Sequence, residues 1–192
     1  HHLAGKTNAV TGRFFKPRPS EEFYDNFKDF HNIDNQIDDP LHQSKIKELK
    51  KELRRQQLKY FDSGLMPEEM RNRIIREKKT TVYEFVRDPK LYPLAKYLDY
   101  ADFALERKKK NLNTLTNGLS DDDPVIRYWS VVGLLLLEKT AKPAISTLKK
   151  VLDDQDEIAP LAAWAIYKAG SENFAKQWML KENNKNLRRE LI

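Results

Sequence analysis

Acidic side chains cluster at three places where they could, in principle, hold a cation or share a proton. Glu21 and Glu22 are adjacent, Asp38 and Asp39 are adjacent, and three aspartates occupy 121–123. Each cluster adjoins turn-forming residues or the expected start of a helix, where carboxylates accept hydrogen bonds from free backbone N–H groups. We therefore interpret all three clusters as turn, strand or helix-cap residues.

Nucleophilic and metal-ligating residues are sparse. The chain has no cysteine, which excludes thiolate catalysis, disulfides and cysteine-based metal sites. His31 and His42 lack the spacing of metal ligands and are interpreted as exposed or turn residues. The six glycines are scattered and form no phosphate-binding loop. The sequence therefore predicts no catalytic, cofactor-binding or metal-binding residue in this chain.

Basic residues are concentrated on three stretches of a chain whose net charge is +6. These stretches are Lys45–Lys59, Arg71–Lys79 and Arg107–Lys110. Such stretches attract polyanions, so DNA, RNA and a sulfated glycan are candidate partners. Aromatic side chains do not alternate with the charges, as they do in proteins that bind single strands. A solvated helix face is the simplest interpretation, an anionic glycan comes next, and nucleic acid is the least favoured.

A long helix is expected to carry the first basic stretch. Asp38–Pro40 is a helix-start signal just before Leu41. Apolar residues then recur at helical spacing, at Ile46, Leu49, Leu53 and Tyr60. We expect this helix to end at Asp62–Gly64, because glycine tolerates the left-handed conformation that closes helices.

Two further helices are expected before the last third of the chain. Pro67 stands where a helix can begin, since its missing N–H costs nothing in the first turn. A connection follows around Arg87–Pro89, and the next helix is expected over Pro93–Arg107. No run of about 18 apolar residues occurs, so no membrane-spanning helix is expected.

The last third of the chain repeats with a period of 33 residues. The matched residues are Leu115 and Leu148, Leu119 and Leu152, and Asp123 and Asp156. Apolar helices are expected after each acidic turn, over Tyr128–Leu137 and Leu161–Tyr167, and each turn would supply the N-cap of its helix. Two such copies predict an α-solenoid, with a third, partial copy from Ser171 through Leu187–Arg188.

Two kinds of side chain in these repeats are assigned structural roles. The three tryptophans lie in apolar helices and are expected in the core, namely Trp129, Trp164 and Trp178. Arg127 is expected to form an ion pair with an acidic turn, at Asp121 or Asp154.

One stretch of the repeats carries a family signature. The run Asp-Pro-x-Ile-Arg at 123–127, followed by Trp129 and Gly133, is similar to the second-helix signature of HEAT repeats. The later copy departs from it, since Pro160 stands where the first copy has Arg127. The resemblance implies a mainly α fold, with an α-solenoid of HEAT or armadillo-like helical repeats.

The first forty residues carry a second resemblance. The order of Glu22-Phe23-Tyr24-Asp25, Asp29, Ile33, Asn35 and Asp38-Asp39-Pro40 is similar to the closing signature of type I sulfatases. Stretches 4–9, 13–15 and 62–68 are similar to the heparan N-sulfatase (sulfamidase-like) branch, some bacterial members of which have a HEAT-like extension similar to 100–137. Phe30 departs from that pattern, where the family has Pro, and Asn26 departs where it has Leu.

The sulfatase resemblance implies three parts. Residues 1–40 would be the end of the sulfatase C-terminal subdomain, with a short strand over Glu22–Asp25. Residues 41–90 would be basic helices or a linker, and residues 91–192 the HEAT-like repeats. The short β remnant would therefore precede a long helix and the solenoid.

The same resemblance implies a function for the protein to which this chain would belong. That protein would hydrolyse sulfate esters or sulfamates of sulfated glycans, with calcium in a catalytic domain outside this chain, in an extracytoplasmic compartment. The nucleophile motif C/S-x-P-x-R is absent from the 192 residues, so this chain alone is not expected to be an enzyme. Its partners would be its own catalytic domain, a second copy of itself or an anionic glycan.

Two other functions are compatible with the same residues. The first is a free-standing basic HEAT-repeat module that binds protein or nucleic acid. The second, which is least favoured, is an enzyme complete within these residues.

Overall fold

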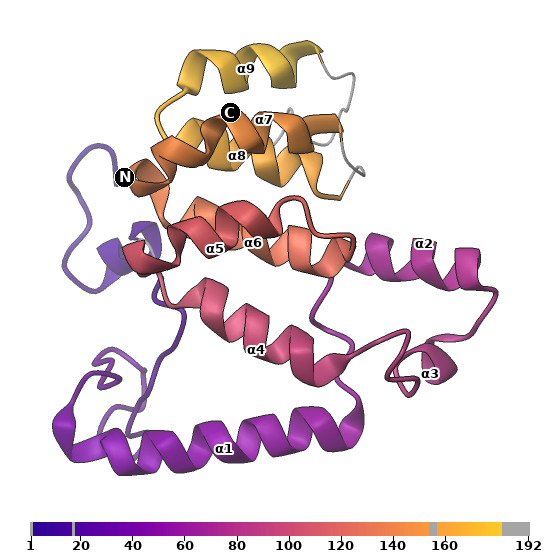
Figure 1. The fold of residues 1–192 in the computed structure, drawn as a ribbon. Coiled ribbons are helices and arrows are strands. Elements are labelled where there is room, and N and C mark those ends of the chain that lie inside the picture. The colour runs from indigo at the N-terminus through magenta and orange to yellow at the C-terminus, as the bar shows by residue number, and fades with distance from the viewer. Residues whose placement is uncertain (1, 17, 154–156, 182–192) are drawn as a thin grey trace. The chain divides into compact units, whose positions relative to one another are not determined.

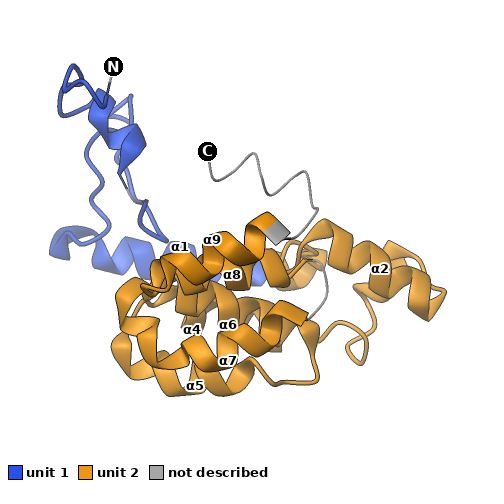
Figure 2. Ribbon diagram, turned by 90° about the horizontal axis from the view of Figure 1, so that it is seen from above, with its two compact units in different colours: residues 1–56 blue, residues 57–192 orange. Residues whose placement is uncertain are grey.

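The computed structural model describes residues 2–16, 18–153 and 157–181 (Figure 1). Helices are the regular elements of these residues, which contain no strand, so the mainly α class expected from the sequence is confirmed. The chain divides into two compact units, residues 1–56 and 57–192, which Figure 2 shows in blue and orange.

The first unit is irregular chain followed by the start of a long helix. Its regular elements are the 3₁₀ helices η1 (Thr11–Phe15) and η2 (Pro40–His42) and the α-helix α1 (Gln43–Tyr60), which continues into the second unit. The predicted start signal is confirmed, because the Asp39 carboxylate accepts a hydrogen bond from the Leu41 N–H at 2.9 Å. Of the apolar residues expected at helical spacing on α1, Ile46 is buried, whereas Leu49 and Leu53 are exposed.

The short strand expected over residues 22–25 is not formed in this structure. Phe23 is instead held by two hydrogen bonds to the segment that follows: its N–H donates to Asn35 Oδ1 at 2.9 Å, and its carbonyl accepts from the Gln36 N–H at 2.8 Å. A strand needs a ladder of successive bonds to a neighbouring strand, and one bonded residue does not make a ladder.

Helix α1 ends at Tyr60, and Phe61 takes the left-handed position after it, which was expected of the glycine in Asp62–Gly64. Phe61 takes the left-handed conformation with φ 56°, and the Asp62 N–H donates to the Gln57 carbonyl at 3.0 Å. These are the features of a Schellman C-cap, which usually has glycine at this position. Gly64 lies beyond the cap, and its N–H donates to Asp62 Oδ1 at 2.8 Å.

The second unit contains the remaining α-helices of the described residues. They are α2 (Glu68–Lys78), α3 (Val82–Phe85), α4 (Leu94–Leu105), α5 (Leu112–Gly118), α6 (Pro124–Leu136), α7 (Ile145–Lys150), α8 (Ala159–Lys168) and α9 (Glu172–Lys181), with 3₁₀ helices η3 (Lys109–Asn111), η4 (Glu138–Ala144) and η5 (Val151–Asp153). The helices predicted from Pro67, from Pro93 and after both acidic turns are present. The short α3 was not predicted; it begins at a capping box formed by Thr81 and Glu84.

Helices α4 to α9 are arranged in successive layers. Helix α5 packs on α6, α7 packs on α8, and α6 lies between α4 and α8, with α9 against α8 (Figure 1). The two helix pairs correspond to the two copies of the 33-residue period. Of the third copy, α9 is described, and Leu187–Arg188 lie outside the described residues.

The core of these layers depends on two close approaches at glycine. A Cβ on Gly133 of α6 would lie 2.7 Å from Leu115 Cδ2 of α5, and Leu115 is fully buried. A Cβ on Gly118 would lie 2.2 Å from both the Tyr100 hydroxyl and the Ser130 hydroxyl, which are hydrogen-bonded to each other at 2.8 Å. Side chains larger than hydrogen are therefore excluded where α5 meets α4 and α6.

The prediction for the tryptophans is only partly met. Trp129 and Trp178 are half-buried and pack against the core. Trp164 is 45% exposed, so the expectation of a core position was wrong for this residue. Helix α8 buries a run of alanines on its inner face instead, at Ala159, Ala162, Ala163 and Ala165.

Candidate functional site

The aspartate run at 121–123 is a helix cap, as predicted. Asp123 Oδ1 accepts a hydrogen bond from the Val125 N–H at 3.0 Å, and Oδ2 lies 3.3 Å from Lys96 Nζ. The Tyr97 hydroxyl also donates to Asp123 Oδ1, at 3.3 Å. Burial, together with the Asp123 carboxylate, raises the pKa of Tyr97 well above its ordinary value. The carboxylate thus has backbone, ammonium and hydroxyl partners within the fold.

Arg127 holds the same turn through backbone carbonyls. Its Nη1 donates to the carbonyl oxygens of Asp121 at 2.9 Å and Asp122 at 3.2 Å. The other expected partner, Asp154, lies outside the described residues. Arg127 therefore stabilises the link between α5 and α6, which is a structural role.

The second acidic turn behaves differently from the first. The N-cap of α8 is Ile158, whose side chain cannot accept a hydrogen bond, so the side-chain cap predicted for this turn is not formed at that position. Asp156, which the repeat period matches to Asp123, lies outside the described residues. Glu157 points instead to α2, where its Oε1 lies 3.3 Å from Arg73 Nε. Sequence reasoning missed this ion pair because 84 residues separate its partners.

The ion pair between Arg73 and Glu157 is poorly hydrated. The Glu157 side chain is 7% exposed and that of Arg73 is 23% exposed. Burial lowers the pKa of the Arg73 guanidinium, but hydrogen bonding and attraction to Glu157 and Glu77 outweigh this and leave the pKa above its usual value. Arg73 Nη2 and Glu157 Oε2 are buried without a hydrogen-bond partner. The pair links α2 to the start of α8.

The histidines and the remaining acidic pairs lie in structural surroundings. The His42 ring contacts the Phe23 ring, and the His31 ring contacts the Phe30 ring, each at a centroid distance of 5.2 Å. Glu21 pairs with Lys50 of α1. Among the residues that the structure describes, no group of three or more acidic or histidine side chains is arranged to hold a metal ion.

The basic stretch of α1 is an exposed helix face with internal pairing. Lys45 Nζ lies 2.9 Å from Glu48 Oε1, and Arg55 Nη2 lies 2.6 Å from Glu52 Oε1. Pairs at this spacing on an exposed helix contribute only about 0.2–0.5 kcal/mol each. This arrangement agrees with the solvated-face interpretation of Lys45–Lys59.

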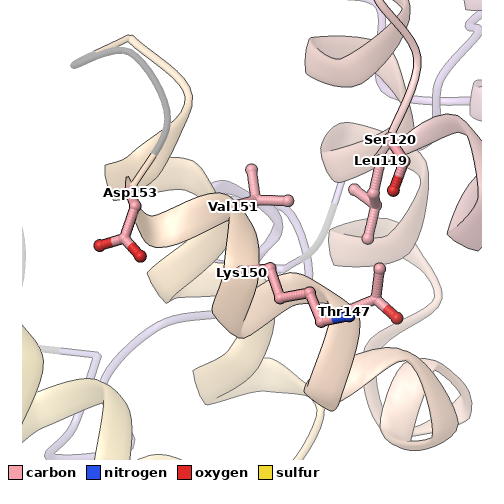
Figure 3. A pocket seen from close by; sticks show the side chains of 6 residues that line it. All are labelled: Leu119, Ser120, Thr147, Lys150, Val151 and Asp153. Atoms are coloured by element: carbon pink, nitrogen blue, oxygen red, sulfur yellow. The ribbon is translucent and has the colours of Figure 1, made fainter.

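A shallow groove lies between the ends of α5 and α7 (Figure 3). Its volume is about 270 Å³, and the buried Leu119 and Val151 contribute apolar surface to it. The polar residues that line it are Ser120, Thr147, Lys150 and Asp153. Ser120 and Thr147 contribute hydroxyl groups to the groove, and Lys150 and Asp153 contribute one charge of each sign.

Exposed aromatic rings are the most unusual surface feature of the first unit. Phe14 is 78% exposed, Phe27 103% and Phe30 83%. Large apolar side chains gathered in one segment typically mark a surface that another molecule covers. The sequence showed that aromatic residues are frequent in this segment, but it could not show that the first unit leaves their rings exposed to solvent.

No protein-family model, curated protein or solved structure matches this chain. The resemblances to sulfatases and HEAT repeats therefore stay predictions from the sequence. In the described part of the chain, no helix combines the length and the apolar character needed to cross a membrane.

Proposed function

We propose that this chain is the non-catalytic C-terminal part of a sulfatase-like hydrolase. Residues 1–40 would pack on the catalytic protein, and the helices of the second unit would form a HEAT-like scaffold. The observation that carries the proposal is the exposure of Phe14, Phe27 and Phe30 within residues 1–40, the part that resembles the end of the sulfatase C-terminal subdomain.

Burial of these rings would be strongly favourable. Covering one phenylalanine side chain contributes about 1.5–3 kcal/mol. Residues 22–25 are also irregular, with no strand beside them among the described residues. A catalytic domain that offered a sheet edge would pair this backbone and cover the rings at the same time.

The helix pairs of the second unit support the HEAT-like part of the proposal. The pairs α5–α6 and α7–α8 pack in successive layers through α6 and α8. Asp123, Pro124 and Arg127 have the cap, first-turn and turn-holding positions that the repeat signature implies. In this proposal the scaffold packs on the catalytic domain, supports an interface between subunits, or presents a surface to a glycan.

The chemistry of the proposed parent protein would reside elsewhere in that protein. The resemblance implies a formylglycine nucleophile, a calcium ion bound by Asp and Asn side chains, and sulfated glycans as substrates, in an extracytoplasmic compartment. No residue of this chain is assigned to that site. The chain alone would therefore not hydrolyse sulfate esters or sulfamates.

The deciding experiment is to sequence the source DNA upstream of the His1 codon. We expect several hundred in-frame codons that include C/S-x-P-x-R and an Asp-Asp metal pair. A start codon immediately before His1 would overturn the proposal.

A second test uses the longer protein, once it is in hand. Replacing Phe14, Phe27 and Phe30 by Ser should lower its melting temperature and leave that of the 192-residue chain unchanged. Equal effects on both proteins would show that the catalytic domain does not cover these rings.

The alternative function is a free-standing HEAT-like module that binds protein or nucleic acid. The groove between α5 and α7 favours this alternative, because it offers a binding surface that needs no further domain. Salt-dependent DNA binding by the purified chain would support the nucleic-acid form of this alternative.

A further inference from the structure

Three links between helices lie at one edge of the second unit. Helices α4 to α9 follow one another through short links and alternate in direction, so the links α4–α5, α6–α7 and α8–α9 return to the same edge (Figure 1). Two contacts confirm this arrangement. Helix η4 packs directly on α5, and Lys168 at the end of α8 lies 3.4 Å from Glu138 in the α6–α7 link.

Two of these links and the last residue of α8 carry a group of lysines that we call the basic edge, and Arg107 lies beside it in the first link. Its members are Lys108, Lys109, Lys110, Lys139, Lys142 and Lys168. Lys108 pairs with Glu106 at 3.2 Å, and Lys168 pairs with Glu138. The other four lysines are exposed and no salt bridge is formed by them within the described residues, although Lys110 also attracts the Glu106 carboxylate and helps to lower its pKa.

The opposite edge of the same unit uses its charges internally. Lys96 pairs with Asp123, which also caps α6, and Glu157 pairs with Arg73 of α2. The basic edge therefore brings exposed lysines from separate links close together, and such a group of cations attracts anions from solution.

From this arrangement we infer that the basic edge binds an anionic polysaccharide that carries sulfate or carboxylate groups. The four unpaired lysines come from two links that adjoin in space but are distant in sequence. An ammonium group on a flexible stem binds a single oxyanion without demanding a fixed geometry. Such groups suit a flexible chain whose anionic groups are separated by uncharged ring atoms.

The composition of the basic edge argues against nucleic acid. Its three links, residues 106–111, 137–144 and 169–171, contain no aromatic side chain on which a base could stack. The edge also presents the ends of helices, and no helix side that could enter a major groove. The inference does not rest on the sulfatase proposal, since a free-standing module would have the same edge.

The test measures binding of a short heparin oligosaccharide to the 192-residue chain by calorimetry, at about 50 mM and about 200 mM salt. The test variant carries Lys109→Glu, Lys110→Glu, Lys139→Glu and Lys142→Glu. A control variant makes the same change in charge on exposed residues of α1 and α2, with Lys47→Glu, Lys51→Glu, Arg76→Glu and Lys78→Glu. Circular dichroism checks that both variants are folded. If either variant is not folded, the same positions in both sets are changed to Gln in place of Glu.

We expect heparin affinity to fall at least about tenfold in the test variant and less than about threefold in the control, with a marked salt dependence. Equal losses in the two variants would overturn the inference, since only overall charge would then matter. Absence of binding at the lower salt would also overturn it. Single-stranded and duplex DNA of equal total charge are the competitors, and tighter binding of either one would overturn the choice of a polysaccharide.

Discussion

Trp129 on α6 donates a hydrogen bond from Nε1 to the carbonyl oxygen of Leu65 at 2.8 Å. The bond fastens the loop between α1 and α2 to the helix layers, and the loop buries Leu65 and Met66 there. Tyr92 holds the same loop, because its hydroxyl donates to the Asp62 carbonyl at 2.8 Å.

Replacing Trp129 by Phe should destabilise the second unit by about 1–3 kcal/mol, because the Leu65 carbonyl would lose its hydrogen-bond partner. Urea unfolding followed by circular dichroism measures the change. Trp164→Phe is the matched control, since that indole is half exposed, and it should change stability by less than about 0.5 kcal/mol. Equal effects of the two substitutions would show that the bond to Leu65 contributes nothing.

Gly133→Ala should destabilise the protein by about 1–3 kcal/mol, because the added methyl would overlap the fully buried Leu115. The double variant Gly133→Ala with Leu115→Ala is the informative comparison. Removing the Leu115 side chain provides space for the new methyl, so the two losses of stability should sum to more than the loss in the double variant. Additive effects in thermal unfolding would contradict the proposed overlap.

Arg73→Met should destabilise the protein by about 1–3 kcal/mol, because it leaves the nearly buried carboxylate of Glu157 without its charged partner. Adding Glu157→Gln should restore part of the loss, since a neutral amide costs less to bury than an unpaired carboxylate. Arg76→Met is the control on the same helix, because Arg76 is exposed. If Glu157→Gln deepens the loss in the Arg73→Met background, the pair is not what links α2 to α8.

Stability should fall as pH rises from about 10 to about 12, in part because of Tyr92. Burial raises the pKa of Tyr92 from 10.0 to about 12. The neutral hydroxyl is therefore favoured in the folded state, and the stabilisation is complete below the unfolded pKa. It is lost as pH rises through the folded pKa, to an extent of about 2–3 kcal/mol.

The check for Tyr92 is urea unfolding at several alkaline pH values, in comparison with Tyr92→Phe. The variant lacks the ionisable group, so its stability should fall less steeply over this pH range. Identical slopes would assign the alkaline loss to other groups.

The helix starts were predictable because their signals are local. Asp39 and Asp123 lie within a few residues of the N–H groups they cap, and the proline after each one favours a helix start at that point. The end of α1 was not predictable from residue type, because the left-handed position after Tyr60 is occupied by Phe61, whereas glycine is the usual residue there. The Arg87 guanidinium lies 4.4 Å from the centroid of its ring, a tertiary contact that local sequence does not reveal.

Properties that depend on distant partners were missed or misjudged. The apolar spacing of α1 predicted a helix correctly, but it could not indicate that Leu53 would be exposed. The link from Arg73 to Glu157 joins segments with no sequence relation, and the basic edge exists only because alternating helices bring separate links together.

The anchoring of the loop by Trp129 and Tyr92 has a practical consequence for dividing the chain. An expressed fragment that begins at residue 91, where the sequence predicts the start of the repeats, would lack Leu65 and leave Trp129 without its acceptor. It would also lack Phe85, whose ring contacts that of Tyr92, and Asp62, whose carbonyl accepts the Tyr92 hydrogen bond. It would also uncover the apolar surface that Met66 and Met70 now protect. We expect such a fragment to aggregate, whereas one that begins near residue 57 keeps the whole anchored loop and should remain monodisperse.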